Sequence, residues 1–157
     1  MPALTPCLWF DMNAQEAAEF YTTVFPNSKV LSTSYYPEGT PLPAGTVLTV
    51  EFELDGSRFT GLNGGPQFQF TEAVSFQIDC GGQDEVDHYW NSLIADGGEE
   101  SQCGWCKDRF GVSWQVVPRR LFELLADPDR NVAQRVSDVL MKMQKIEIAL
   151  LEEAARG

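Results

Sequence analysis

Two stretches of the chain share one pattern, and together they decide the fold. They read LWFDMNAQEAAEFY at residues 8–21 and FQIDCGGQDEVDHY at residues 76–89. Four pairs of like residues are each displaced by 68 positions, namely Asp11 and Asp79, Gln15 and Gln83, Glu19 and Asp87, and Tyr21 and Tyr89. A shared offset across several positions indicates that one module occurs twice, although two independent strand-to-helix entries would also explain it.

Each module is predicted to follow the order β-α-β-β-β. The first begins with a strand over Thr5 to Phe10 and a helix capped by Asn13, with Glu16 completing a capping-box-like pair. The helix is expected to end before Pro26, and Asp55-Gly56 is typical of a hairpin turn. The remaining strands are expected over residues 29–36, 46–54 and 57–63.

The second module is predicted to have a strand over 73–80 and a helix over about 84–95, followed by short strands. Its last hairpin is CGWCKDRFGVSWQVVP at 103–118, with a tight turn at Asp108 to Gly111. Two tryptophans, a lysine and a glutamine give this hairpin an apolar body and polar tips. Such a mixture is typical of the wall of a small-molecule pocket.

Helical patterns follow Pro118. A short amphipathic helix is expected over the apolar residues Leu121, Phe122, Leu124 and Leu125. A longer helix is expected from the spacing of Val136, Val139, Leu140, Met143, Ile146, Leu150 and Leu151. We expect this stripe to pack on the sheet or at a subunit interface, and not on a membrane.

Composition narrows the class of protein. The 157 residues are 43% hydrophobic and 11% aromatic, which favours one globular domain with a substantial core. Eleven basic against 23 acidic residues give a net charge of −12, which argues against nucleic acid and anionic membranes as partners. No apolar run is long enough to span a bilayer and no secretory signal pattern is visible, so we expect a cytoplasmic protein.

Four cysteines occur, at Cys7, Cys80, Cys103 and Cys106. The Cys-x-x-Cys spacing of the last two raises a redox or zinc hypothesis. In a strand, alternation would turn the side chains of Cys103 and Cys106 to opposite faces. No second cysteine pair is present to complete a zinc site. We therefore expect reduced thiols that line the core or a pocket.

The chain resembles the PhnB-like branch of the vicinal oxygen chelate superfamily, which includes glyoxalase, bleomycin resistance and extradiol dioxygenase proteins. That branch is often labelled 3-demethylubiquinone-9 3-methyltransferase. The resemblance rests on residues 8–26, 61–66, 103–118, 127–130 and 135–148. It implies an α+β fold in which two βαβββ modules form a cupped mixed sheet. We expect a single domain over 1–157, with modules at about 1–68 and 69–118 and C-terminal helices at about 119–157.

The same resemblance implies positions for a divalent metal held by histidine and glutamate side chains. In the last strands those positions are Gln115 and, in the first module, the region of Asn63. In the first strands they lie near residues 5–7 and 73–75. None is His, Asp or Glu, and the lone His88 falls in a helix. A neutral amide is a weaker ligand than a carboxylate, so we expect no metal and no cofactor.

A cleft without a metal is expected to remain. Its candidate ligand-binding residues are Cys7, Trp9, Asn63, Ser75, Gln77, Cys103, Trp105, Lys107 and Gln115. Strand alternation predicts that Cys103, Trp105 and Lys107 share one face, as do Ser113 and Gln115. Which face of either strand lines the cleft stays open, and so does whether Trp105 is core or pocket.

Three functions from different classes are compatible with these patterns. A non-catalytic protein that binds a small aromatic or polar molecule is favoured by the missing ligands and the aromatic, amide-rich lining. An enzyme is the second hypothesis, either a metal-dependent lyase or dioxygenase or the labelled methyltransferase. No glycine-rich loop opens a methyl-donor helix after a strand. A dimeric interaction protein is the third, and a homodimer is expected in any case.

Overall fold

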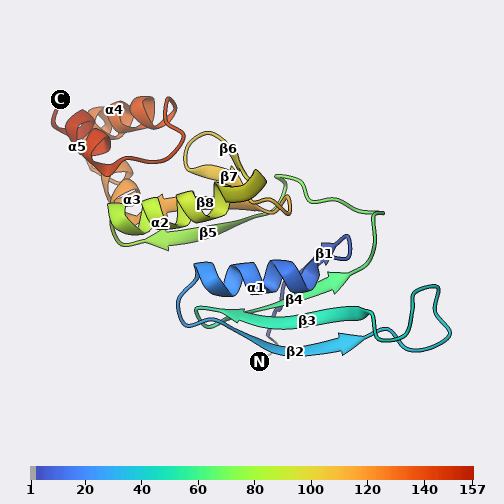
Figure 1. Ribbon diagram of the computed structural model, residues 1–157. Coiled ribbons are helices and arrows are strands. Elements are labelled where there is room, and N and C mark those ends of the chain that lie inside the picture. The colour runs from blue at the N-terminus through green and yellow to red at the C-terminus, as the bar shows by residue number, and fades with distance from the viewer. Residues whose placement is uncertain (1–2) are drawn as a thin grey trace. The chain divides into compact units, whose positions relative to one another are not determined.

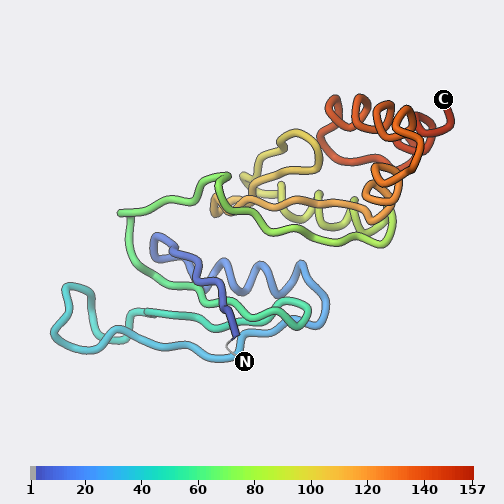
Figure 2. Tube along the Cα trace, turned by 180° about the vertical axis from the view of Figure 1, so that it is seen from behind, coloured from blue at the N-terminus to red at the C-terminus, as the bar shows by residue number. Residues whose placement is uncertain are grey.

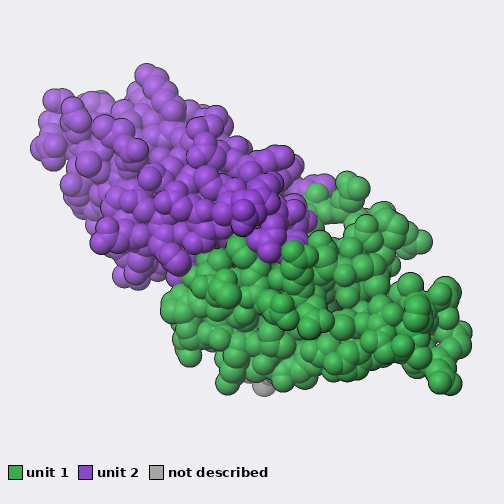
Figure 3. Space-filling model, viewed as in Figure 1, with its two compact units in different colours: residues 1–70 green, residues 71–157 purple. Residues whose placement is uncertain are grey.

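The computed structural model describes residues 3–157, which fall into two compact units (Figure 3). The units are Met1–Phe70 and Thr71–Gly157. Each contains a four-stranded mixed sheet and a helix that follows the first strand, as the duplicated pattern predicts (Figure 1). Within residues 3–157 no helix combines the length and the apolar character that crossing a bilayer requires. The α+β class and the two βαβββ modules are confirmed.

The first sheet has the strand order β1-β4-β3-β2. Its elements are β1 (Cys7–Phe10), α1 (Ala14–Val24), β2 (Lys29–Tyr35), β3 (Val47–Leu54) and β4 (Ser57–Asn63). The first strand runs parallel to β4, and the other neighbours are antiparallel. Asp55 and Gly56 have φ angles of 45° and 87°, which is the left-handed pair that an Asp-Gly hairpin turn requires.

Helix α1 covers one face of this sheet because its small and aromatic residues fall on one side. Ala14, Ala17 and Tyr21 are fully buried, and the Tyr21 ring lies 6.1 Å from that of Phe52 in β3. A Cβ on Gly61 of β4 would lie only 3.2 Å from the Ala14 Cβ. The helix therefore sits close to the strands that carry these residues.

The second sheet has the order β5-β8-β7-β6. Its elements are β5 (Ser75–Cys80), α2 (Gln83–Ile94), the 3-10 turn η1 (Ala95–Gly97), β6 (Glu99–Glu100), β7 (Trp105–Lys107) and β8 (Ser113–Pro118). The turn from Asp108 to Gly111 is closed by a backbone hydrogen bond between these two residues, 3.0 Å long. The buried Asp108 carboxylate also accepts the backbone N–H groups of Phe110 and Val112.

Three helices follow β8 within the second unit, and Figures 1 and 2 show them gathered at its C-terminal end. They are α3 (Arg119–Leu125), α4 (Arg130–Leu140) and α5 (Ile148–Arg156). The short helix after Pro118 is confirmed. The apolar cluster that joins them consists of Val117, Leu121, Leu124, Val136, Met143, Ile146 and Leu151.

The prediction of one long helix over the Val136 to Leu151 stripe is wrong, because the chain leaves the helix between α4 and α5. Carbonyl groups of this break accept hydrogen bonds from the loop before β7. Cys103 N–H donates to Met143 O at 2.9 Å, and Gly104 N–H donates to Gln144 O at 2.8 Å. A continuous helix would use those carbonyls internally. Tertiary bonds outweigh the helical pattern here.

The predicted side-chain cap from Asn13 is not formed. Asn13 stands at the N-cap of α1, but its side chain makes no capping hydrogen bond. The Ala14 N–H is instead accepted by Asn63 Oδ1 at 2.8 Å, from the end of β4. A strand residue thus satisfies one of the free donors at the helix start.

Candidate functional site

The second sheet carries a row of polar side chains on the face away from α2. Strand register pairs Gln77 with Gln115 and Gln115 with Trp105, and it pairs Ser113 with both Ser75 and Lys107. The alternate positions, which are buried on the α2 side, are Ile78, Cys106, Trp114 and Val116. We call the set Ser75, Gln77, Trp105, Lys107, Ser113 and Gln115 the polar face of the second sheet.

Two hydrogen bonds fix the amides of the polar face. Gln77 Nε2 donates to Gln115 Oε1 at 3.3 Å, and Gln115 Nε2 donates to Ser75 Oγ at 2.8 Å. This chain holds the Gln115 amide in one orientation across β5 and β8. The second N–H of the Gln115 amide and the hydroxyl hydrogen of Ser75 are not used in these two bonds and can donate to a bound molecule.

Trp105 differs from the other three tryptophans. Each of those three donates its indole N–H to a protein oxygen, but within residues 3–157 the Trp105 N–H meets no acceptor. The acceptors are Gly65 O for Trp9 at 2.9 Å, Glu100 Oε1 for Trp90 at 3.1 Å and Asp108 Oδ2 for Trp114 at 2.8 Å. Trp105 is half-buried, and its N–H is not among the buried polar atoms without a partner, so this donor is open to solvent. Its ring offers both apolar area and a donor.

A small cavity of about 130 Å³ adjoins the polar face. Its lining consists of Trp105, Lys107 and Ser113 together with Glu72, Glu99, Glu100, Ser101 and Cys106. Ser113 is only 1% exposed, and its hydroxyl has no hydrogen-bond partner in the part of the chain that the structure describes. Burying a hydroxyl without a partner is unfavourable by about 1–3 kcal/mol. The cavity therefore contains an unmet polar group.

Lys107 forms an ion pair with Glu72, which precedes β5. The side chains are 33% and 59% exposed. The hydrogen bond from Lys107 holds the pKa of the Glu72 carboxyl below its ordinary value, and the same bond raises the pKa of Lys107. The ammonium group is thus held as a cation beside the cavity.

Four of the nine predicted site residues lie outside the polar face, namely Cys7, Trp9, Asn63 and Cys103. Asn63 is 3% exposed, and its register opposite Phe10 puts it on the α1 side of the first sheet. There it receives the Ala14 N–H and donates to Val47 O at 3.0 Å. The expectation that Asn63 lines the cleft is therefore wrong, since its amide joins a helix to the sheet.

Cys103 does not share the face of Trp105 and Lys107, and that expectation is also wrong. Its φ angle of 59° places it in a turn before β7, where strand alternation does not hold. Its thiol points to Leu140 O at 3.6 Å and to the Met141 sulfur at 3.8 Å.

In the first sheet, Cys7 and Trp9 lie on the face away from α1. Register pairs them with Thr60 and Leu62 of β4, so Leu62 is the first-module counterpart of Gln115. Thr60 donates to the Glu51 carboxylate at 2.8 Å. Sequence reasoning overlooked Thr60, Leu62 and Glu51, although counting alternate positions forward from the Asp55-Gly56 turn would have found Thr60 and Leu62.

The side chains on these faces do not fit the divalent metal that the fold class implies. The matched strand positions hold Gln115, Leu62, Cys7 and Ser75, which include no carboxylate and no imidazole. Among residues 3–157 no group of three or more His, Cys, Asp or Glu side chains is arranged to hold a metal ion. His88 lies in α2, where its ring contacts Tyr89.

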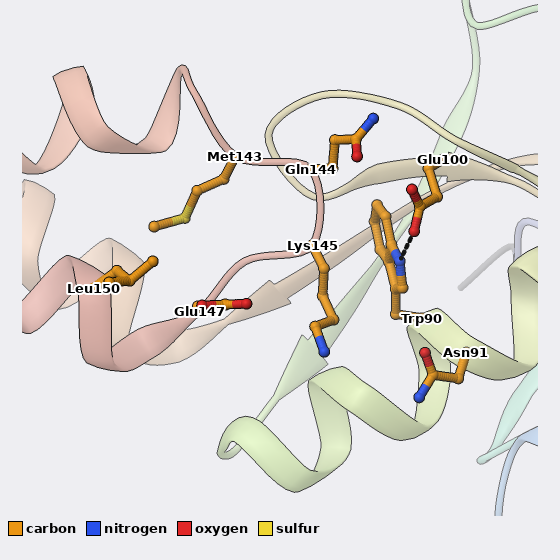
Figure 4. A pocket seen from close by; sticks show the side chains of 8 residues that line it. All are labelled: Trp90, Asn91, Glu100, Met143, Gln144, Lys145, Glu147 and Leu150. Atoms are coloured by element: carbon orange, nitrogen blue, oxygen red, sulfur yellow. Dashed lines mark hydrogen bonds between the residues drawn. The ribbon is translucent and has the colours of Figure 1, made fainter.

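A second and larger cavity of about 380 Å³ lies in the same unit, and Figure 4 shows its lining. Residues of α2 and β6 meet the segment between α4 and α5 there, and the lining consists of Trp90, Asn91, Glu100, Met143, Gln144, Lys145, Glu147 and Leu150. Three of its polar side chains are already engaged, since Trp90 donates to Glu100 and Lys145 pairs with Asp87 at 2.9 Å. Trp90 is also only 1% exposed. The polar face is the stronger candidate.

Most of the chain matches the model of one protein family. Residues 2–117 match the family model described as 3-demethylubiquinone-9 3-methyltransferase. The match includes both modules and ends before α3, so the C-terminal helices lie outside it. No curated protein matches the sequence significantly.

Solved structures resemble the chain over the same extent. A PhnB protein from Bacillus cereus is 32% identical over 74% of this chain and 99% of that chain, with a TM-score of 0.67. Protein PA1353 from Pseudomonas aeruginosa is 19% identical over 75% and 98%, with a TM-score of 0.62, and shares the fold. A fosfomycin resistance protein, FosX, from Listeria monocytogenes, solved with Mn(II) and sulfate, is 20% identical over 72% and 88%, with a TM-score of 0.49.

Proposed function

The chain belongs to the 3-demethylubiquinone-9 3-methyltransferase family, the PhnB-like branch of the vicinal oxygen chelate superfamily, and on that premise we propose that it binds a small molecule. The proposed ligand is aromatic or polar and lies on the polar face of the second sheet. The observation that carries the proposal is the Trp105 indole, whose N–H alone among the four tryptophans has no acceptor in residues 3–157. A ligand acceptor would satisfy it.

The neighbours of Trp105 support this placement. Gln115 is its register partner, and its amide is held by Ser75 and Gln77. A fixed amide beside a half-buried indole can orient a flat polar molecule, because stacking supplies area while hydrogen bonds set direction. The Lys107 ammonium group lies on the same face, where its charge is balanced by the Glu72 carboxylate.

We propose that binding needs no metal and no other cofactor. The support is chemical, since a Gln115 amide and a Leu62 side chain stand where carboxylate ligands would be required. Elemental analysis of the purified protein should give well under one zinc, nickel, iron or manganese per chain. Chelators should leave the melting temperature unchanged. One tightly held transition metal per chain would contradict the proposal.

Methyl transfer is a second candidate, which the description of the matched family favours. It requires a site for a methyl donor in addition to the acceptor. Titration with S-adenosylmethionine, followed by calorimetry, separates the candidates. The binding proposal expects no saturable heat, whereas methyl transfer requires donor binding and a methylated product.

Mass spectrometry of the native protein tests the binding proposal directly. We expect a compound retained from the cell to be released on denaturation and to be depleted in Trp105→Ala. The control is Tyr35→Ala, because Tyr35 is an exposed aromatic residue of β2 that lines neither cavity and should leave retention unchanged. Equal retention by both variants would place the ligand elsewhere.

We also propose that the chain is a cytoplasmic homodimer. The C-terminal helices still expose Phe122, Met141 and Leu150, which gives apolar area beyond the cluster that they bury. Light scattering should report a dimer at micromolar concentration. A monomer there would contradict this proposal and would leave the ligand proposal unaffected.

A further inference from the structure

The small cavity beside the polar face contains donors that lack acceptors. The Ser113 hydroxyl is buried without a partner, and the Trp105 N–H meets no acceptor in residues 3–157. Lys107 lines the same cavity and adds ammonium hydrogens. A ligand group that accepts hydrogen bonds would satisfy all three, and a carboxylate offers two oxygens with several lone pairs.

A carboxylate of the protein already engages one of these donors. Glu72 pairs with Lys107 and lines the cavity, yet its side chain is 59% exposed. It belongs to the segment that leads from the unit boundary at Phe70 and Thr71 into β5. An exposed side chain on a connecting segment can leave Lys107 without disturbing the buried core.

Charge at the cavity decides how an anion would bind. Glu99 of β6 stands opposite Lys107 in the strand register, and Glu100 also lines the cavity, so with Glu72 three carboxylates lie around one ammonium group. A further carboxylate added beside them would be repelled. A ligand carboxylate that replaces Glu72 on Lys107 keeps that ion pair neutral while the exposed Glu72 side chain turns to solvent, and it can accept hydrogen bonds from Ser113 and Trp105.

We propose that Glu72 is an internal ligand of Lys107 that an aromatic carboxylate displaces on binding. This inference rests on the proposed function and assigns the ligand class of that site. The incoming carboxylate takes the place of Glu72 on Lys107 and accepts from the Ser113 hydroxyl, while its ring lies on Trp105. Glu72 thereby weakens binding of anions and excludes those without a ring to stack.

Titration of the full-length protein with benzoate, and with benzamide as its neutral analogue, tests the exchange. Binding is followed by the indole N–H resonance of Trp105. Glu72→Gln should tighten benzoate binding roughly three- to tenfold and leave benzamide nearly unchanged, because it frees Lys107. Lys107→Met should weaken benzoate at least about tenfold and abolish the preference for it over benzamide. Glu123→Gln is the matched control, since Glu123 pairs with Arg120 on α3 and should change neither affinity.

The Glu72 carboxyl gives a second readout, through its carbon resonance during a pH titration. Its pKa lies below the ordinary value while it bonds Lys107, and benzoate should raise it as the bond is lost. If both probes shift Trp105 but Glu72→Gln leaves benzoate affinity unchanged, the internal-ligand proposal fails and the binding site stands. If neither probe shifts Trp105 in the wild type or in Glu72→Gln, the proposed function fails and the inference fails with it.

Discussion

The two modules follow one plan, but they build their sheets differently. In the first, β2 and β3 are seven and eight residues long, and they pair from Lys29 to Tyr35 with two register shifts. In the second, the matching strands β6 and β7 have only two and three residues. The short strands nevertheless carry Trp105 and Lys107, which are central to the candidate site. The first sheet has the longer strands, but the second sheet carries the side chains of the candidate binding site.

The C-terminal helices compensate for the short strands. Their break accepts the N–H groups of Cys103 and Gly104, and Ile146 is fully buried against this loop. The Gly104 carbonyl in turn accepts Val116 N–H at 2.8 Å. The loop before β7 is thus hydrogen-bonded both to the break between α4 and α5 and to β8. Residues outside the family match hold the strand on which the site depends.

The largest predicted effect on stability comes from disrupting the packing of this loop at Gly104. Gly104 has a φ of +83°, and a Cβ there would lie 2.7 Å from Ile146 Cδ1 and 2.9 Å from Val116 O. Gly104→Ala should lower the free energy of unfolding by about 2–5 kcal/mol, since backbone strain and overpacking add. Gly45→Ala is the control, because Gly45 has a φ of +88° with nothing within 4 Å. It should lose about 1–2 kcal/mol in urea unfolding. Equal losses would show that Ile146 does not pack on the loop.

The next effect tests the first module. Asn63→Ala removes the acceptor for Ala14 N–H and the donor to Val47 O, both in a buried setting. We expect a loss of about 2 kcal/mol in the free energy of unfolding. Asn63→Asp keeps the acceptor for Ala14 N–H but sets a buried carboxylate oxygen against Val47 O, so it should lose at least as much. Ligand affinity should not change in either variant. A loss of affinity at unchanged stability would show that Asn63 contributes to ligand binding.

A smaller effect concerns alkaline pH and the two buried thiols. Burial raises the pKa of Cys80 and of Cys106 to about 12 in each case. The unfolded chain loses these protons near the ordinary thiol pKa of about 8.5. The stability that the thiols contribute is therefore complete below that pH and is lost as the pH rises toward 12. Cys106→Ala should show a shallower loss between pH 8 and 10 in urea unfolding. An unchanged slope would contradict the assigned burial.

Sequence reasoning succeeded where local chemistry decides the structure. The Asp55-Gly56 turn, the β4 strand at 57–63 and the pairing of Ser113 and Gln115 on one face follow from turn residues and alternation. The same reasoning brought together five of the nine candidate residues on the polar face. These are Ser75, Gln77, Trp105, Lys107 and Gln115.

It failed where distant segments decide. Asn63 faces α1 because β1 and β4 pair in a register that no single strand reveals. Cys103 left its expected face because a left-handed turn interrupts the strand. The break after Leu140 exists because the loop before β7 takes its carbonyls. Each error comes from a tertiary hydrogen bond or register that local patterns do not contain.

The most direct test of the account uses the four indole N–H resonances of uniformly ¹⁵N-labelled protein. Three of them are bonded within the protein, and we predict that these stay in place when benzoate or benzamide is added. The Trp105 resonance should exchange fastest with solvent in the free protein, and it alone should shift on addition of the probe. A protected Trp105 resonance, or shifts confined to Trp9 or Trp90, would contradict a binding site on the polar face of the second sheet.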